Sequence, residues 1–335
     1  MKNVLYIGNA LSSKGKTITT IETLSEQLRE LCSIKIASKK TNKVHRLFDM
    51  IRLIALNKSE TDYVIIDTYS TLNFYYALII SQICRVLKLS YIPILHGGKL
   101  ENRLKNNPKF CKIIFKNAHK LIAPSSFLLS IFKSYGFTDV LYIPNNINID
   151  NYNFKNREID VIKLLWVRSF SLIYNPQLAI LVLENLLKRG YKTELTMIGP
   201  DVDGSLEKVK ALAESKNLDV NFTGKLSKQD WTELSKDHNV FINTTDFDNM
   251  PVTLIEAMAL GLPIVSTNVG GIPFLVSDKE DAILVPPKDI NAMTQAIIKL
   301  KNNRILKDKL ITIARIKAEQ FDWKIVKSKW AMLLS

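Results

Sequence analysis

Residues 240–271 carry the pattern of a strand, a loop, a short helix and a second strand, in the run VFINTTDFDNMPVTLIEAMALGLPIVSTNVGG. The apolar runs at 240–243 and 263–267 have the length of buried strands. Pro251 suits the first helical turn, because its missing N–H has no partner there, and Gly261 suits a left-handed helix end. The stretch therefore predicts a βαβ unit of a parallel sheet, with its helix packed on one face.

The loop at 244–250 leads away from the carboxyl edge of that sheet, where open α/β sheets bind ligands. The unpaired N–H groups at the helix start favour an anionic group such as a diphosphate. Asp248 in the loop and Glu256 on the helix flank this point and can accept hydrogen bonds from sugar hydroxyls on either side of a phosphate. Taken singly, Asp248 is better explained as a helix cap and Glu256 as a solvated helix residue, whereas together they favour a ligand site.

The same alternation of strands and helices runs through the rest of the chain. The other expected strands lie at 4–7, 34–37, 63–66, 91–95, 120–123, 140–143, 163–167, 195–198, 220–223 and 282–285. Helical spacing of apolar residues separates them. This alternation predicts right-handed βαβ units and parallel sheets, so we expect an α/β fold.

A chain of 335 residues is too long for one small core and fits two domains. Hydrophobic residues make up 47% of it, which excludes a disordered type. Residues 1–150 carry 21 Lys and Arg against 10 Asp and Glu, whereas the remainder carries 25 against 22. The basic first part favours an anionic partner, namely nucleic acid, anionic lipid or a phosphorylated acceptor, although a Lys-rich composition explains it nearly as well.

The three cysteines, Cys32, Cys84 and Cys111, are an odd number without metal-ligand spacing, and the four histidines show no paired spacing. We therefore expect reduced thiols, a cytoplasmic location and no metal site. No signal peptide is expected, since residues 3–8 are a short strand with no cleavage pattern after it. The longest apolar stretch, 74–95, contains charged residues and divides better into a helix and a strand than into a membrane span.

The stretch at 240–271 resembles the nucleotide-sugar motif of the family 4 glycosyltransferases. The family pattern is an acidic residue, seven others and then Glu, followed by Ala-Met-Ala-x-Gly-x-Pro-Ile/Val-Val. The residues that fit it are Asp248, Glu256, Ala257, Met258, Ala259, Gly261, Pro263, Ile264, Val265, Gly270 and Gly271. The first acid of the pattern is usually Glu, so the shorter side chain of Asp248 is a departure.

The resemblance implies a GT-B fold, in which two Rossmann-like domains face a cleft. We expect an N-terminal acceptor-side domain at 1–155, a C-terminal nucleotide-sugar-binding domain at 156–322, and a last helix at 323–335 that packs back on the first domain. The implied reaction is the retaining transfer of a hexosyl unit from a nucleotide-diphosphate sugar to an acceptor hydroxyl, without a cofactor or divalent metal. By the same analogy we expect a glycan or lipid-linked acceptor, in bacterial surface polysaccharide or glycolipid synthesis.

The resemblance also implies roles for residues of the second domain. Glu256 would accept hydrogen bonds from the nucleotide ribose, and Asp248 would act as a catalytic residue on the transferred sugar. The cation of Arg168 and the backbone around the helix start would hold the diphosphate. These backbone positions are Asn249, Met250, Pro251, Val252 and Thr253. The Lys that family members carry five or six positions after the Arg is missing from 171–176, which leaves the second cation unassigned.

Other strand ends supply further candidates. His96 follows a strand directly and precedes a Gly pair, and family members commonly carry His there, so we propose it as a catalytic residue near the transferred sugar; a structural role is as well supported. Gly199 follows another strand, and Gly224 and Lys225 follow the segment that borders the nucleobase in the family. The polar run at 67–70 is best explained as a helix cap through a hydroxyl, and alternatively helps to shape the acceptor side.

The first turn, GNALSSKGKT at 8–17, nearly spells a P-loop, but Ala10 stands where the first Gly is required. No apolar run ending in an acidic pair supplies a partner motif, so a P-loop NTPase is a minor alternative. The resemblance offers another interpretation, a flexible loop near donor and acceptor. Gly15 would be its pivot and Lys16 a phosphate contact.

Residues 99–120 interleave seven Lys or Arg with Leu, Phe and Ile. Such a segment can make a peripheral contact with an anionic membrane, at its inner face, or can be an ordinary amphipathic helix packed on the sheet, which we favour slightly. A nucleic-acid partner is not expected, because no recognised nucleic-acid module is present. A GT-B-like scaffold that binds a nucleotide without catalysis is the main alternative to an enzyme.

Overall fold

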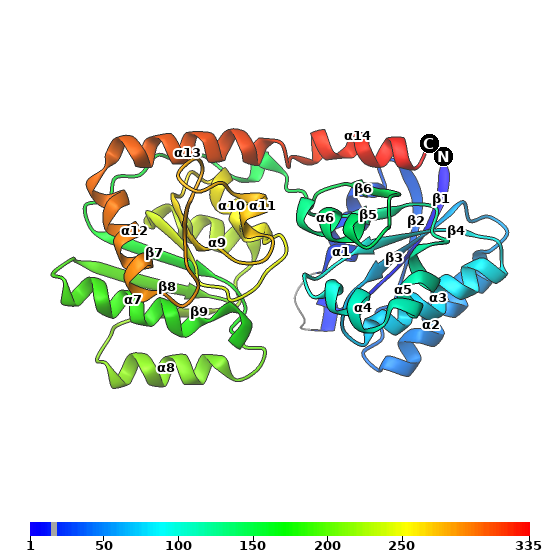
Figure 1. Cartoon of the computed structure of the whole chain (residues 1–335), viewed down its shortest axis with the longest axis horizontal. Coiled ribbons are helices and arrows are strands. Elements are labelled where there is room, and N and C mark those ends of the chain that lie inside the picture. The colour runs from blue at the N-terminus through cyan, green and yellow to red at the C-terminus, as the bar shows by residue number, and fades with distance from the viewer. Residues whose placement is uncertain (15–18) are drawn as a thin grey trace. The chain divides into compact units, whose positions relative to one another are not determined.

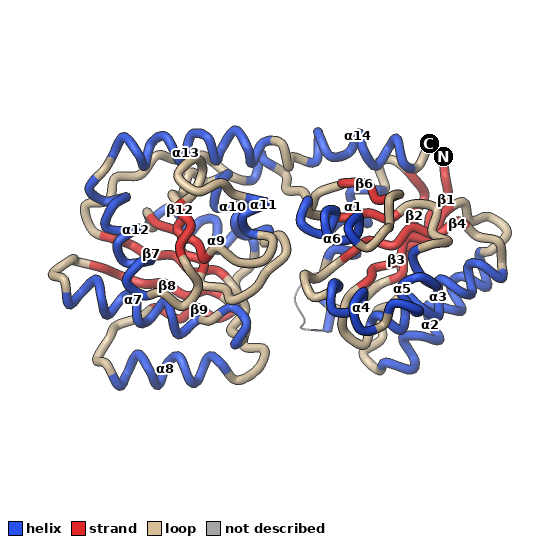
Figure 2. The backbone as a smooth tube through the Cα atoms, in the orientation of Figure 1, coloured by secondary structure: helices blue, strands red, loops and turns tan. Residues whose placement is uncertain are grey.

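The computed structural model describes residues 1–14 and 19–335, which form two compact units (Figure 1). The first unit comprises Met1–Asn145 and Trp323–Ser335, and the second comprises Asn146–Asp322. Each unit contains a six-stranded sheet whose strands pair in parallel (Figure 2). The predicted α/β class is therefore confirmed.

The sheet of the first unit has the strand order β2-β1-β3-β4-β5-β6. Its strands are β1 (Lys2–Ile7), β2 (Cys32–Ala37), β3 (Tyr63–Thr68), β4 (Ser90–Leu95), β5 (Leu121–Ala123) and β6 (Val140–Tyr142). They lie at the six positions expected from the apolar runs. Their ends differ by a residue or more, because backbone pairing rather than apolarity decides where a strand ends.

Side chains alternate between the two faces of this sheet. Val4 and Tyr6 of β1 pack on one face with α1 (Thr20–Leu28) and α14 (Trp323–Leu333), whereas Leu5 and Ile7 pack on the other. The second face is covered by α2 (Lys43–Asn57), α3 (Asn73–Val86), α4 (Leu100–Asn106), α5 (Pro108–Phe115) and α6 (Ser126–Ser134). A parallel sheet buried on both faces explains why its strands read as continuous apolar runs.

The sheet of the second unit has the order β12-β11-β10-β7-β8-β9. Its strands are β7 (Ile162–Val167), β8 (Thr193–Ile198), β9 (Asn221–Gly224), β10 (Val240–Asn243), β11 (Ile264–Thr267) and β12 (Ile283–Val285). The order reverses between β7 and β10, because the chain continues from β7 to β8 on one side and from β10 to β11 on the other. This is the dinucleotide-binding arrangement of Rossmann folds.

Helices connect these strands and complete the second unit. They are α7 (Pro176–Lys188), α8 (Ser205–Ser215), α9 (Lys228–Leu234), α10 (Val252–Ala259), α11 (Ile272–Leu275), α12 (Ile290–Asn302) and α13 (Arg304–Glu319). Short 3-10 turns lie at η1 (Ser12–Lys14), η2 (Ile149–Asn151), η3 (Leu172–Tyr174) and η4 (Ser235–Asp237). Side chains cap two of these helices, since Ser227 accepts from the N–H of Asp230 and Asp289 accepts from that of Ala292.

The first unit ends at Asn145, ten residues before the boundary at 155 that the sequence predicts. The reason is packing, because Ile147 and Tyr152 are buried in the core of the second unit. Ile147 N–H also donates to the carbonyl of Phe321 over 2.9 Å, within that unit. The polar composition of this segment suggests a linker, but its few apolar residues decide where it belongs.

The helix α14 completes the first unit. Trp323, Val326 and Trp330 are buried with residues of α1. The indole N–H of Trp323 donates to Glu30 over 3.1 Å, and Lys327 forms an ion pair with the same carboxylate. One apolar helix face and two polar contacts therefore hold this distant part of the chain on the first sheet.

The apolar stretch at 74–95 folds as α3 and β4, as its polar interruptions predict. No helix in the described parts of the chain combines the length and apolarity needed to cross a bilayer. The basic segment at 99–120 divides at Pro108 into α4 and α5, because proline cannot continue the preceding helix. Ile114 and Phe115 of α5 are buried, which agrees with packing on the sheet, whereas Phe110 and Ile113 are exposed.

Candidate functional site

The strand order of the second sheet reverses between β7 and β10, and residues predicted for donor binding follow the carboxyl ends of both strands. Arg168 directly follows β7, and the loop at 244–250 directly follows β10. The connections leaving these strands diverge, which opens a ligand crevice in folds of this kind. The strand order thus explains why two segments far apart in the sequence reach one sheet edge.

The helix α10 begins at this edge. Pro251 occupies the N-cap position with φ −69° and ψ 116°, one residue before the first turn where the sequence predicts it, and no side chain that the structure describes caps the helix. The first N–H groups of the helix are therefore available to an acceptor from outside the helix. Gly261 ends the helix at φ +72°, as predicted, because only glycine adopts this conformation readily.

Glycines let two pairs of backbone segments approach each other closely at this edge. A Cβ on Gly271 would lie 1.8 Å from the carbonyl oxygen of Asn249, and one on Gly270 would lie 2.3 Å from that of Asp248. Likewise, a Cβ on Gly199 would lie 1.8 Å from the carbonyl oxygen of Arg168. These glycines are therefore required to shape the site, and Gly199, predicted for donor binding, acts by supporting the backbone of Arg168.

Arg168 and Asp248 form an ion pair between Nη2 and Oδ2. The Arg168 guanidinium also lies over the ring of Tyr174, 4.6 Å from its centroid, in a cation–π contact. Burial lowers the pKa of the Arg168 guanidinium, against the opposing influence of Tyr174 and Glu256. Its buried Nε has no hydrogen-bond partner among the residues that the structure describes, so this N–H donor is unsatisfied.

Glu256 is buried, with 2% of its surface exposed, so the structure contradicts the solvated-residue interpretation. Its Oε1 accepts a hydrogen bond from the Tyr152 phenol over 2.8 Å and forms an ion pair with Lys228 over 2.9 Å. Burial, together with the Glu256 charge, raises the pKa of Tyr152 far above its usual value, so the phenol stays a donor. Both contacts are made by Oε1, which leaves Oε2 to accept a further hydrogen bond.

Three residues of this site are not predicted as such by the sequence. Tyr152 lies in the run that composition assigns to a linker, Lys228 starts a helix, and Tyr174 lies in the segment that lacks the expected Lys. Tyr152 is 104 positions from Glu256, so no local pattern points from one to the other. Tyr174 is the residue of the three that the sequence could have indicated, since it stands six positions after Arg168, where the family carries a Lys.

The remaining predicted donor-binding residues lie along the same sheet edge. Asn249 and Met250 are buried, and Met250 packs in the core, so any ligand contact from Met250 would come from its backbone. Val252 and Thr253 are half-buried at the start of α10. Gly224 ends β9, where its carbonyl accepts from Gly199 N–H over 2.9 Å, and the exposed Lys225 follows it. These two residues therefore lie at the same sheet edge as Arg168, on the far side of β8.

A cavity of about 370 Å³ lies beside Tyr152 and Lys228. Its other lining residues are Asn151, Asn153, Gln229, Thr232, Glu233, Lys236 and Leu260. Because Tyr152 and Lys228 both contact Glu256, the cavity adjoins the buried carboxylate. Polar side chains and exposed carbon atoms both line the cavity, which suits a ligand that has hydrogen-bonding groups as well as apolar faces.

His96 in the first unit is buried and follows β4 directly. Its Nε2 is 2.8 Å from Oδ1 of Asp67, which also accepts a hydrogen bond from the Tyr6 phenol over 2.8 Å. The ring stacks on Tyr69 with 5.0 Å between centroids. These contacts fix the imidazole orientation, and with Nε2 bound to a carboxylate, Nδ1 is the nitrogen left for another partner.

Asp67 is the penultimate residue of β3 and is nearly fully buried. Its Oδ2 has no hydrogen-bond partner in the described residues, and a Cβ on Gly8 would lie 2.5 Å from it, so a larger residue at this position would displace the carboxylate. Burial and the Asp67 charge raise the pKa of Tyr6. The helix-cap interpretation of the run at 67–70 is wrong, because α3 is preceded by Leu72 and lacks a side-chain cap.

Gly15 and Lys16, predicted for the loop after β1, lie outside the described residues. In residues 1–14 and 19–335, no group of three His, Cys, Asp or Glu side chains is arranged to hold a metal ion.

Residues 148–317 match the family model described as "Glycosyl transferases group 1". A putative colanic acid biosynthesis glycosyltransferase, WcaL of Salmonella typhimurium, is 40% identical over 93 residues, which are 27% of this chain and 22% of that protein. The chain spans about a fifth of the length of the curated relatives that it matches first, with 22% covered in each of two.

Solved structures match the whole chain. The sucrose-phosphate synthase of Thermosynechococcus elongatus has a TM-score of 0.83 at 16% identity, with 99% of this chain and 98% of that one covered. Anabaena HepE in complex with UDP-glucose has a TM-score of 0.79 at 16% identity, with 100% and 99% covered. At this level of identity the likeness shows the fold, which is GT-B with two Rossmann-like domains, as predicted.

Proposed function

We propose, from the premise that the chain belongs to the glycosyl transferases group 1 family, that it is a retaining glycosyltransferase with a nucleotide-diphosphate sugar as donor. A hexosyl unit would pass to a hydroxyl group of a glycan or lipid-linked acceptor. The name of the relative WcaL, which refers to colanic acid biosynthesis, supports a surface polysaccharide or glycolipid as the acceptor class. Because HepE was solved in complex with UDP-glucose, this nucleotide sugar is the first donor to test.

The observation that carries this proposal is the meeting of Arg168, the start of α10 and Glu256 at one sheet edge. A diphosphate at this edge would accept from the free N–H groups of α10 and from Arg168. Each hydrogen bond to a charged group is worth about 1.5–3 kcal/mol. Since Arg168 already pairs with Asp248, the diphosphate would replace one anion with another, and Asp248 would be released toward the sugar.

Glu256 would bind the ribose through Oε2, because Tyr152 and Lys228 already occupy Oε1. A ribose presents two adjacent hydroxyl donors, which match a carboxylate oxygen held in a fixed position. The nucleobase would then lie near Gly224 and Lys225, at the neighbouring strand end. For His96 we propose a contact with the transferred sugar through Nδ1, with Asp67 as the residue that orients the ring.

In the proposed reaction the bond between the anomeric carbon and the diphosphate oxygen breaks, and a bond to the acceptor oxygen forms on the same face of the sugar. The acceptor proton passes to the departing phosphate oxygen. Arg168 and the helix N–H groups would stabilise the negative charge that develops on the diphosphate. No side chain is assigned as a covalent nucleophile, and no divalent metal is part of the proposal.

A thermal-shift screen of UDP, GDP and ADP sugars tests donor binding, since a ligand stabilises the folded form in proportion to its binding. Donor hydrolysis or transfer by the pure protein then separates an enzyme from a non-catalytic nucleotide-binding scaffold. The anomeric configuration of the product, read by NMR, tests retention. Failure of every nucleotide sugar to bind would remove the proposal, and binding without turnover would favour the scaffold.

Two substitutions connect the proposal to the site. Arg168→Ala and Glu256→Ala should each lower transfer by about tenfold or more, because each removes charge-assisted contacts worth over about 1.4 kcal/mol. The matched controls are Arg189→Ala and Glu207→Ala, whose side chains are exposed in the second unit. Normal transfer by either site variant would remove that residue from the donor site.

A further inference from the structure

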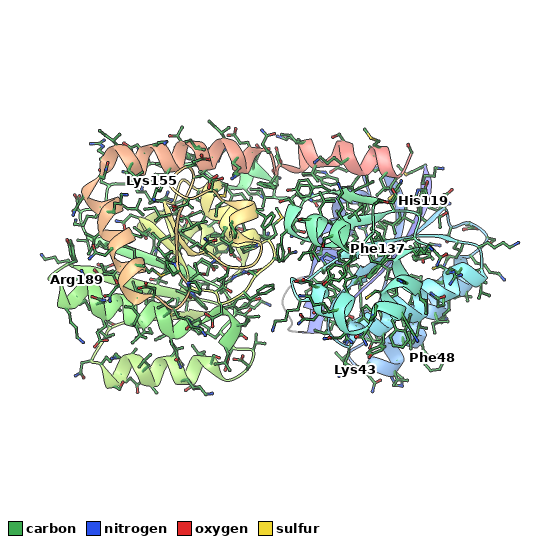
Figure 3. All side chains as sticks on the ribbon, in the orientation of Figure 1. Lys43, Phe48, His119, Phe137, Lys155 and Arg189 are labelled. Atoms are coloured by element: carbon green, nitrogen blue, oxygen red, sulfur yellow. The ribbon has the colours of Figure 1, made fainter. Side chains whose placement is uncertain are left out.

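The helices α2, α3 and α5 cover one face of the first sheet, and their outward sides carry exposed apolar residues. On α2, Val44, Phe48 and Leu56 continue one helical row with Arg52 between them, at intervals of four positions. Phe48 and Leu56 are each 69% exposed. Lys43 and Phe48 lie at the outer border of the unit in the side-chain view (Figure 3). An apolar row on a solvent-facing helix side has no role in the core.

The apolar surface continues from α2 onto α3 and α5. The Tyr76 phenol of α3 donates to the carbonyl of Lys43 on α2, and Gln82 of α3 donates to that of Ile113 on α5, so the three helices are neighbours. The exposed apolar residues of α3 and α5 are Tyr75, Ile79, Val86, Phe110 and Ile113. Val86 alone is 82% exposed. We call the outward sides of α2, α3 and α5 the outer face.

The outer face is strongly basic. Its exposed cations are Lys43, Arg52, Arg85, Lys109 and Lys112, and the exposed Lys116 directly follows α5. The three helices contain a single acidic residue, Asp49, which is half-buried and accepts a hydrogen bond from Ser38. On the adjoining helix α4, Glu101 is paired with Lys105 over 2.8 Å. Cations on this face are therefore not neutralised by acids of the same helices.

We propose that the outer face docks on the surface of an anionic lipid bilayer. Exposed aromatic and aliphatic side chains flanked by Lys and Arg match a bilayer surface, where apolar groups enter the acyl boundary and cations meet lipid phosphates. Nucleic acid would match the cations but offers little to Val44, Leu56 and Val86. A second copy of the chain would set cations against cations. The inference goes beyond the proposed function and does not depend on the donor.

Vesicle sedimentation tests the proposal with the whole chain. The protein is mixed with vesicles of phosphatidylcholine alone or of phosphatidylcholine with phosphatidylglycerol, at low and at high salt, without any nucleotide sugar. Binding is expected to the anionic vesicles only, and salt should weaken it by screening. The same assay in a preparation that fails to bind nucleotide sugars still tests the outer face, so the two proposals can fail separately.

Two pairs of substitutions separate the charged and apolar contributions. Lys109→Gln with Lys112→Gln should weaken binding to anionic vesicles about thirtyfold, from about a fivefold loss per cation. Phe48→Gln with Leu56→Gln should weaken it about tenfold or more. The matched controls in the second unit are Lys208→Gln with Lys309→Gln, and Ile305→Gln with Ile316→Gln, all at exposed positions, and these should bind as the unchanged protein does.

Several results would overturn the proposal. These are no binding to anionic vesicles at low salt, equal binding to neutral vesicles, or equal losses in outer-face and control variants. Dimers in light scattering that disappear with Phe48→Gln would assign the face to a second copy instead. All substituted side chains are exposed, so the variants should fold, and an unchanged Tm establishes that before vesicles are added.

Discussion

Removal of the Tyr152 phenol should cost more folding stability than removal of the Lys228 cation, although both groups contact the same oxygen of Glu256. Tyr152 donates a buried hydrogen bond to a carboxylate, and such a bond is worth about 1.5–3 kcal/mol. Lys228 has 58% of its side chain exposed, so water and salt screen its ion pair. Exposed ion pairs contribute about 0.2–1 kcal/mol.

The variants are Tyr152→Phe and Lys228→Met, which keep most of the apolar volume of each side chain. We expect Tyr152→Phe to lower the free energy of unfolding by about 2 kcal/mol, which corresponds to a fall in Tm of about 4–8 °C. Lys228→Met should lower it by about 1 kcal/mol or less, and the difference from the unchanged protein should shrink as salt is added. Urea denaturation of both variants, at two salt concentrations, measures these losses.

Donor binding gives a second measurement on the same variants. Glu256 would keep Lys228 as a partner in Tyr152→Phe but would lose part of its fixed orientation. If the Glu256 side chain must leave its preferred rotamer to bind the donor, the cost is about 0.5–1.5 kcal/mol, which should raise the donor Kd about two- to tenfold. Equal losses of stability for the two variants, or a larger loss for Lys228→Met, would refute the argument that burial makes Tyr152 the stronger partner.

Three further outcomes follow from single contacts. Tyr174→Ala should raise the donor Kd about fivefold, since a cation–π contact is worth about 1 kcal/mol, whereas Tyr174→Phe should bind almost as tightly as the unchanged protein in a donor titration. Gly271→Ala should abolish donor binding, because its Cβ would lie 1.8 Å from the Asn249 carbonyl oxygen, and calorimetry checks it. Burial raises the pKa of the three thiols, to about 11 for Cys32 and about 12 for Cys84 and Cys111. Iodoacetamide at mildly alkaline pH should therefore label these cysteines only in unfolded protein, and mass spectrometry measures the labelling.

Local patterns in the sequence predict the strands and the central motif because those features depend on neighbouring residues. The run at 240–271 folds as β10, α10 and β11 as expected, with Gly261 in the left-handed conformation. Arg168 could be placed beside the loop at 244–250 because both follow strands of one parallel sheet. For these elements, periodicity and the chirality of βαβ units contain most of the information.

Side-chain partners distant in the sequence could not be predicted. The contacts of Tyr152 and Lys228 with Glu256 depend on how three separate segments pack. The preferences of single residues for helix, strand or turn do not predict such packing. The hydrogen bond between His96 and Asp67 likewise joins the ends of β4 and β3, whose register pairs Thr68 with Leu95. The predicted unit boundary at 155 differs from the observed one because the segment is mostly polar and is therefore interpreted as a linker. The burial of Ile147, which assigns the segment to the second unit, becomes evident only in the fold.

The first unit is assembled from two separate parts of the chain, with α14 contributing to its core. During synthesis on the ribosome, the whole of Asn146–Asp322 emerges before α14 does. Domains usually fold in order from the N-terminus as the chain is made. Here the second unit, being continuous, can finish folding first, while the earlier-made sheet leaves Leu24 and its neighbours uncovered until Trp323, Val326 and Trp330 arrive.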